Sequence, residues 1–211
     1  MNKYLTELVG TFFLVFSIGM AVTSGNPLAP LAIGLTLMAM VYMGGHVSGA
    51  HYNPAVTLGI FMRGKIEAAA VGPYIVAQIV GALAATGAVR VLTGEAFAPA
   101  PGAGASVADV LLAEILFTFA LVLVVLNVAT AKATEGNSYY GLAIGFTVTA
   151  GAFAVGPISG GVFNPAVGTG PILVKFAMGL GGIGDLWYYW VGPLVGATLA
   201  ATVFKIQNPD G

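Results

Sequence analysis

The sequence has no cysteine and very few charges, and both shortages exclude classes of protein. Without cysteine the chain forms no disulfide and no thiolate metal site. Asp, Glu, Lys and Arg make up only 7% of the 211 residues, against about 25% in a typical soluble domain. With so few charges, the net charge of −1 says nothing about partners, and the sequence gives no support for binding to nucleic acid. No nucleophile–base pair or metal-ligand cluster stands out either, so we expect neither an enzyme nor a metal site.

The residues that are abundant are apolar and small. Hydrophobic residues account for 58% of the chain, the mean hydropathy is +0.94, and 31 residues are glycine. Small residues let membrane helices approach closely, because apolar side chains gain little by leaving lipid. This composition predicts an integral, multi-pass membrane protein whose main partner is the lipid bilayer.

Six apolar segments are long enough to cross a bilayer, which takes about 20 helical residues. We predict these spanning helices at 4–24, 28–46, 68–92, 107–130, 138–156 and 185–205.

Two further stretches repeat each other. His46–Leu58 reads HVSGAHYNPAVTL and Gly156–Pro171 reads GPISGGVFNPAVGTGP, and the matching residues are offset by 111 positions. Asn is a favoured helix N-cap, and Pro is favoured at the first helical position. Asn53 and Asn164 therefore each begin a short helix, predicted at 54–62 and 165–177, that cannot span the membrane.

The first and fourth spans also match, which pairs Glu7 with Glu114. The sequence thus predicts one all-α membrane domain over 1–211, built from repeats of approximately 1–105 and 106–205. Three spans per repeat make the second repeat inverted, so the two half-helices enter from opposite sides and meet at the midplane. Their N-termini carry partial positive charge, which repels cations.

These features together resemble the aquaporin, or major intrinsic protein, family. The resemblance rests on six spans, a Glu in the first helix of each half, and two Asn-Pro-Ala boxes: Asn53, Pro54, Ala55 and Asn164, Pro165, Ala166. Ser48–Thr57 and Leu186–Gly196 add further matches. The resemblance implies a passive channel for water and small neutral solutes. It also implies a homotetramer with one pore per subunit and no cofactor.

The resemblance also assigns pore residues. The outer selectivity filter of the family corresponds here to Ile33, Ala152, Gly161 and Val167. Water-selective members commonly have an aromatic, a His and an Arg among these positions, and Val167 stands at the Arg position. We therefore predict a wide, apolar filter that passes water and one or more of glycerol, urea, ammonia, hydrogen peroxide or metalloid hydroxides.

Other residues receive supporting roles. A ladder of backbone carbonyls is expected along the pore, from Gly49, Ala50, His51, Tyr52, Gly161, Val162 and Phe163. We expect Glu7, Glu114 and His46 to brace the irregular loops, and His51 to contribute its carbonyl and its bulk. We interpret Trp187, Tyr188, Tyr189 and Trp190 as an interfacial aromatic belt.

Two alternatives to a neutral-solute channel stay open. An aquaporin-fold ion or anion channel is conceivable because the filter Arg is missing, although no charged ring lines the predicted pore. A non-conducting membrane scaffold is the other, although the loops between the predicted helices are short. Five basic residues would face the cytoplasm if the N-terminus lies there, against two outside. We therefore expect both termini in the cytoplasm, and the plasma membrane as the location.

Overall fold

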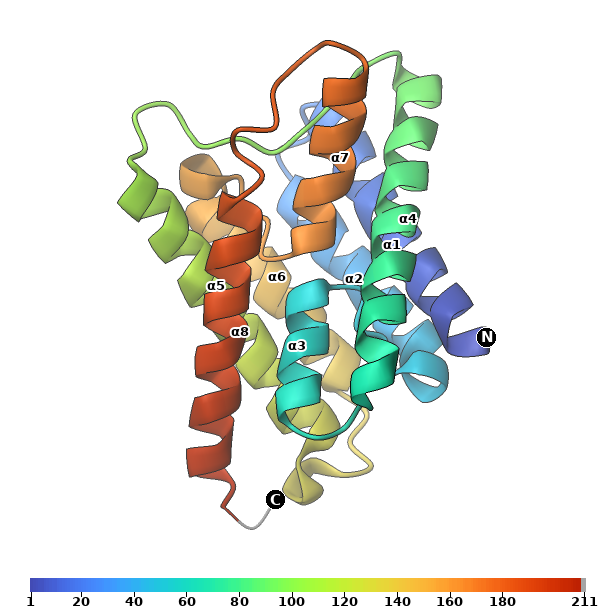
Figure 1. Cartoon of the computed structure of the whole chain (residues 1–211), viewed down its shortest axis with the longest axis vertical. Coiled ribbons are helices and arrows are strands. Elements are labelled where there is room, and N and C mark those ends of the chain that lie inside the picture. The colour runs from blue at the N-terminus through green and yellow to red at the C-terminus, as the bar shows by residue number, and fades with distance from the viewer. Residues whose placement is uncertain (210–211) are drawn as a thin grey trace.

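The computed structural model describes residues 1–209 and places them in eight α-helices and one short 3₁₀-helix (Figure 1). These elements are α1 (Asn2–Thr23), α2 (Ala29–Ser48), α3 (Pro54–Met62), α4 (Ala68–Thr93), α5 (Val107–Thr130), η1 (Lys132–Thr134), α6 (Tyr140–Ser159), α7 (Pro165–Ala177) and α8 (Tyr188–Gln207). Six of the α-helices are long and apolar enough to cross a membrane. Their ends agree with the predicted ends to within three residues, and both predicted half-helices, α3 and α7, are confirmed.

The helix ends follow from local sequence. Both half-helices have an Asn N-cap, whose side chain accepts a hydrogen bond from the backbone N–H two residues on, followed by Pro. Helices α2 and α6 each end at a glycine in the left-handed conformation, Gly49 and Gly160. The chain turns sharply there into the irregular segment that leads to the next Asn.

The two repeats interlock through their half-helices. Helix α1 packs on α4 in the first repeat, as α5 packs on α8 in the second. Each half-helix, however, packs on the last helix of the other repeat: α7 on α4, and α3 on α8. Figure 1 shows α3 and α7 one above the other in the middle of the bundle, running to opposite faces. Each half-helix is therefore held in place by helices of both repeats.

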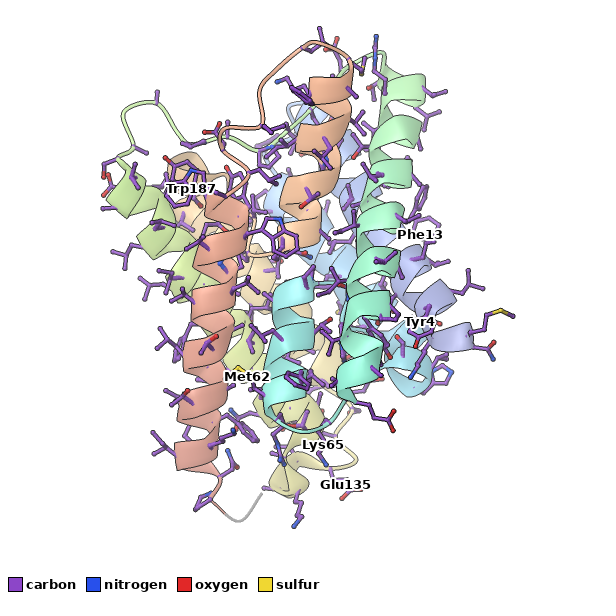
Figure 2. All side chains as sticks on the ribbon, in the orientation of Figure 1. Tyr4, Phe13, Met62, Lys65, Glu135 and Trp187 are labelled. Atoms are coloured by element: carbon purple, nitrogen blue, oxygen red, sulfur yellow. The ribbon has the colours of Figure 1, made fainter. Side chains whose placement is uncertain are left out.

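We name the two ends of the bundle by these half-helices. The α3 face carries the segments 63–67 and 131–139, and the α7 face carries the segments 94–106 and 178–187 (Figure 1). In Figure 2, Lys65 and Glu135 lie at the α3 face, while Phe13 projects away from the bundle on α1 and is 45% exposed. Exposed apolar side chains such as Phe13 suit a surface that meets lipid or another subunit.

Helices α2 and α6 cross at a pair of glycines, Gly34 and Gly145. A Cβ atom added to Gly34 would lie 2.5 Å from the carbonyl oxygen of Gly145 and would overlap the hydroxyl of Thr149. A Cβ added to Gly145 would overlap the carbonyl of Gly34 in the same way. The backbones are thus in direct contact, which only glycine permits at this crossing.

This crossing predicts a stability difference between two Gly→Ala variants. We expect Gly34→Ala to destabilise the protein by about 1–3 kcal/mol, because the added methyl overpacks the crossing. Gly87→Ala in α4 is the matched control, since a Cβ there meets nothing within 4 Å. The measurement is the thermal midpoint of each detergent-purified variant. Equal midpoints would contradict the tight α2–α6 contact.

Candidate functional site

The N-termini of the two half-helices are joined by a reciprocal pair of hydrogen bonds. Asn53 Nδ2 donates to the carbonyl of Phe163 at 2.8 Å, and Asn164 Nδ2 donates to the carbonyl of Tyr52 at 2.9 Å. The side-chain oxygens are occupied as well, because they cap their own helices. An amide nitrogen has two hydrogens, so each Asn retains one N–H with no partner among the described residues.

That N–H is available to a molecule in the cavity, because both Asn side chains line it. The cavity has a volume of about 270 Å³ and extends from the half-helix junction toward the α7 face. Two donors and two helix N-termini thus meet at one point of an otherwise apolar space. The other members of the boxes, Pro54, Ala55, Pro165 and Ala166, are buried away from the cavity.

The irregular segment before α3 is held by the carboxylate of Glu7, which is fully buried on α1. One oxygen accepts from the Ser48 hydroxyl at 2.7 Å and from the His51 N–H at 2.9 Å. The other accepts from the Tyr52 N–H at 2.7 Å and from Gln78 Nε2 at 2.8 Å. Four donors converge on this one side chain.

Glu114 does the same for the segment before α7. Its oxygens accept from the Ser159 hydroxyl at 2.7 Å, the Val162 N–H at 3.0 Å and the Phe163 N–H at 2.7 Å. No side chain in residues 1–209 takes the place that Gln78 has beside Glu7. Backbone N–H groups without water need such acceptors, because an unsatisfied one in an apolar medium costs several kcal/mol.

The predicted brace at His46 needs correction. His46 is exposed in the last turn of α2, and its ring has no hydrogen-bond partner among the described residues. Ser48 takes that place: its hydroxyl donates to Glu7 and accepts from the Ala50 N–H at 3.1 Å. The physical reason is the helix period, since α2 continues through Ser48 and its last turn directs residue 46 away from the segment.

The predicted interfacial aromatic belt at residues 187–190 is also only partly confirmed. Tyr189 is fully buried, and its hydroxyl donates to the Ser159 carbonyl at 2.8 Å. Tyr74 does the same for the Ser48 carbonyl at 2.7 Å in the first repeat. Trp190 donates from its ring to Thr169 Oγ1 at 3.0 Å. Trp187 is 43% exposed and lies where α8 begins, at the α7 face, as a belt residue would (Figure 2).

The four predicted filter residues come together on the wall of the 270 Å³ cavity. Ile33 comes from α2, Ala152 from α6, Gly161 from the segment before α7, and Val167 from α7 itself. None of these side chains has a hydrogen-bond donor. The rest of this wall carries no Asp, Glu, Lys or Arg within the described part of the chain.

The residues of the expected carbonyl ladder lie along two cavities. Tyr52, Gly161, Val162 and Phe163 line the cavity toward the α7 face, Gly49 lines a second one, and Ala50 and His51 line both. The carbonyls of Tyr52 and Phe163 already accept the Asn hydrogen bonds. They therefore join the half-helices as well as bordering the cavity. Ala50, Tyr52 and Phe163 have positive φ angles of 51°, 49° and 50°, a region that costs non-glycine residues about 1 kcal/mol or more.

The second cavity, of about 660 Å³, opens toward the α3 face. Its wall is more polar and includes Lys65, Tyr74, Glu135 and Asn137. Ala50, His51, Val125 and Ile144 line both cavities, so the two spaces adjoin at these residues. One cavity lies toward each face, and the Asn pair lines the first of them.

Comparison with known proteins agrees with this architecture. A family model described as Major intrinsic protein matches residues 1–204. The chain belongs to the major intrinsic protein family. It is accordingly a transmembrane channel for water and small neutral solutes.

Several named proteins are similar to this major intrinsic protein over nearly its whole length. Aquaporin Z of Rhodopseudomonas palustris is 34% identical, over 99% of this chain and 94% of the relative. Aquaporin NIP1-1 of Zea mays is 38% identical, over 97% and 74%. Glycerol uptake facilitator protein-like 6 of Lactiplantibacillus plantarum is 36% identical, over 100% of both. The aquaglyceroporin structure from Plasmodium falciparum has the same fold, with a TM-score of 0.88, 22% identity, and coverage of 99% and 97%.

Sequence reasoning missed several residues of this major intrinsic protein's pore. The segment Phe97–Ala100 lies in the predicted loop between α4 and α5, yet it lines the cavity at the α7 face. The Gly102 N–H holds this segment to the Ile158 carbonyl at 2.9 Å. Gln78 and Thr57 were missed as partners of the Glu7 network. A buried Gln in an apolar span was the one signal available, since such a group needs a partner.

The carboxylate braces predict different costs for two Glu→Gln variants. We expect Glu114→Gln to destabilise the protein by about 1–3 kcal/mol, because its new NH₂ faces a donor and leaves that donor unsatisfied. Glu7→Gln also takes the acceptor from a backbone N–H, but it should cost less, because the Gln78 Oε1 atom has no partner and can accept from the new NH₂ after a flip of the Gln78 amide. No side chain in residues 1–209 takes that place beside Glu114. Thermal midpoints in detergent measure both costs.

Glu95→Gln is the matched control, because Glu95 is exposed and surface changes usually stay within about 0.5 kcal/mol. If all three variants melt together, the carboxylates do not hold the loops.

Proposed function

We propose that this channel passes water together with at least one larger neutral solute, among glycerol, urea, ammonia, hydrogen peroxide and metalloid hydroxides. One observation carries the proposal: the outer ring of Ile33, Ala152, Gly161 and Val167 lines the cavity without a side-chain donor or a charge. Such a ring has no long side chain to narrow the pore, and it has no donor that would favour water over other solutes. The names of similar proteins, aquaporins and a glycerol uptake facilitator, support both kinds of permeant.

The Asn pair is the second element of the proposal. A permeant oxygen at the junction accepts from the free N–H of Asn53 and of Asn164, and a water that does so must direct its own hydrogens away from both. The half-helix N-termini add positive potential at the same point, the effect generally attributed to aquaporin-type pores. Neutral solutes pass, whereas protons and cations are repelled. This argument favours a neutral-solute channel over an ion channel or a scaffold.

We also propose the orientation and location. The segments 63–67 and 131–139 of the α3 face carry Arg63, Lys65 and Lys132, whereas Arg90 and Lys175 lie at the other end, on α4 and α7. The excess of Lys and Arg at the α3 face supports placing that face in the cytoplasm, together with both termini. The membrane we propose is the plasma membrane. The repeat boundaries we propose are 1–105 and 106–205, one single domain in all.

The solute range is tested with purified protein in proteoliposomes. Stopped-flow measurements of water, glycerol, urea, ammonia and hydrogen peroxide under matched conditions should show water flux and flux of at least one larger solute. Current recordings on the same preparation should show no ion conductance above that of empty liposomes. A channel that conducts water and rejects all four solutes would refute the proposal.

Val167→Arg tests the outer ring itself. The guanidinium would fill part of the wide ring, so we expect permeability to urea and glycerol to fall on the order of tenfold more than permeability to water. Val167→Met is the matched control, because it adds length without charge or donors. If both variants block every permeant alike, bulk alone explains the result and the proposed selectivity of this ring is wrong.

A homotetramer is the proposed assembly, with one pore per subunit. Exposed apolar side chains on the outer helices, such as Phe13, Leu116 and Phe153, support a surface that meets lipid and neighbouring subunits. We expect a detergent-corrected mass of four 21.3 kDa subunits. Light scattering coupled to size-exclusion chromatography in several mild detergents checks this mass. A single-subunit mass in all of them would count against the tetramer.

A further inference from the structure

Arg63, the residue at which α3 ends, has a charged side chain that the pore does not use. It lines neither of the two large cavities. Its guanidinium carbon lies 5.0 Å from the centroid of the Phe204 ring on α8, and Phe204 is 1% exposed. The face of an aromatic ring attracts a cation at this distance. The fold therefore holds the guanidinium in one place, against a ring that cannot move away.

This guanidinium has no anion. Arg63 has no hydrogen bond or ion pair within residues 1–209, and its Nε atom is buried without an acceptor. The two terminal nitrogens are not buried, so a molecule from outside the chain can reach them. A guanidinium binds a phosphate or carboxylate best through two parallel hydrogen bonds. The side chain is thus a positioned cation with free donors.

The length of α3 places this cation at the depth of a phospholipid headgroup. Helix α3 begins at Asn53 and has nine residues, which rise about 14 Å at 1.5 Å each. In the proposed inverted repeat the Asn pair lies at the midplane of the bilayer. Half of a typical hydrocarbon core is about 15 Å. The end of α3 therefore reaches the level at which acyl chains give way to phosphates.

Only the last turn of this half-helix reaches the outer surface. Phe61 is 40% exposed and lines neither cavity, whereas residues 54–60 are buried or partly buried. Figure 1 shows α3 between α4 and α8, and it packs on both. Met62 and Lys65, which flank Arg63 in the sequence, lie at this end of the bundle in Figure 2. An exposed apolar ring and a cation without an anion thus occur in one helical turn.

The other charges at this end favour an anionic headgroup. Lys65 and Lys205 are exposed, and they follow Arg63 and Phe204 closely in the sequence. Glu67, which is also exposed, is the one acidic residue of the segment 63–67. Basic residues at a membrane surface attract lipids with a net negative charge.

We propose that Arg63 binds the phosphate of an anionic phospholipid whose acyl chains lie along the outer surface beside Phe61. The terminal nitrogens of the guanidinium donate to two phosphate oxygens, and Phe204 keeps the guanidinium oriented for them. The bound lipid stabilises the end of the half-helix that begins at Asn53. The site lies outside both cavities, so it does not depend on which solutes the channel conducts.

The site is tested by titrating the detergent-purified protein with phosphatidylglycerol and measuring the thermal midpoint. At about tenfold its Kd the lipid should raise the native midpoint by about 4 °C. Arg63→Gln should need on the order of tenfold more lipid for the same rise, because the charged hydrogen bonds are lost. Each rise is measured from the variant's own midpoint without lipid, so that lower intrinsic stability does not imitate weaker binding.

Lys205→Gln is the matched control, because it removes one positive charge from an exposed residue at the same end. It should need no more than about twofold more lipid than the native protein. If Arg63→Gln and Lys205→Gln weaken binding equally, the lipid is attracted by the general charge of this end, and the site at Arg63 is wrong.

Arg63→Lys separates the shape of the group from its charge. A lysine keeps the positive charge but can neither stack flat on Phe204 nor donate two parallel hydrogen bonds. We expect it to bind the lipid about threefold more weakly than the native protein. Binding equal to that of the native protein would overturn the role given to the guanidinium and to Phe204.

A series of ligands separates a lipid from a free anion. Phosphatidylcholine has the same phosphate beside a positive choline and should raise the native midpoint less than phosphatidylglycerol does. Sodium phosphate at the same concentration should not raise it. An equal rise with sodium phosphate would show a site for a free anion, and an equal rise with phosphatidylcholine would show that the charge of the headgroup has no part. Either result would overturn the proposal.

Discussion

Satisfying backbone polar groups inside an apolar bundle is the constraint on which the rest of this structure depends. The segments before α3 and α7 leave the helical conformation at membrane depth, so their N–H groups lose their intrahelical partners. Glu7 and Glu114 supply acceptors from the neighbouring helices, and Ser48 and Ser159 extend them. Because the segments are held in this way, non-glycine residues adopt positive φ angles there, and Asn53 and Asn164 meet at a fixed distance.

The two repeats share this framework but differ in the side chains that face the path. Each repeat contributes one Asn to the pair at the junction and one buried carboxylate that holds its irregular segment. On the α7 side the wall has small or branched apolar residues, such as Ala152 and Val167, whereas the α3 side includes Lys65 and Glu135. Symmetry thus fixes the backbone of the pore, and departures from symmetry distinguish its two ends. The crossing of Gly34 and Gly145 lies between the repeats and allows both to approach closely.

Much of this architecture could be predicted from the sequence because its signals are local. Apolar length gave the six spans, and the Asn-Pro order gave the starts of α3 and α7. The pairing of Glu7 with Glu114 pointed to buried carboxylates that need partners. Other features depend on tertiary contacts that leave no local pattern. Tyr189 looked like a belt residue because its neighbours are aromatic, yet its helix face turns it inward to the Ser159 carbonyl.

The same limit applies to His46 and to the segment Phe97–Ala100. The direction of the His46 ring depends on where α2 ends, and a difference of two residues rotates a side chain by more than half a turn. Phe97–Ala100 has the composition of an ordinary loop, and only its contact with the end of α6 brings it to the cavity. The junction of the two cavities involves residues from three separate parts of the chain, so no single stretch of sequence predicts it.

The reciprocal hydrogen bonds of the two Asn side chains have a consequence for biosynthesis. Asn53 donates to a carbonyl 110 residues further along the chain. At about 5–20 residues per second, a ribosome needs roughly 6–20 s to make that distance. During this interval the first half-helix exists without the partner of its cap residue and without α8, on which it packs. The first half-helix therefore gains the partner of its cap residue, and then the helix on which it packs most, only as the second half of the chain is made.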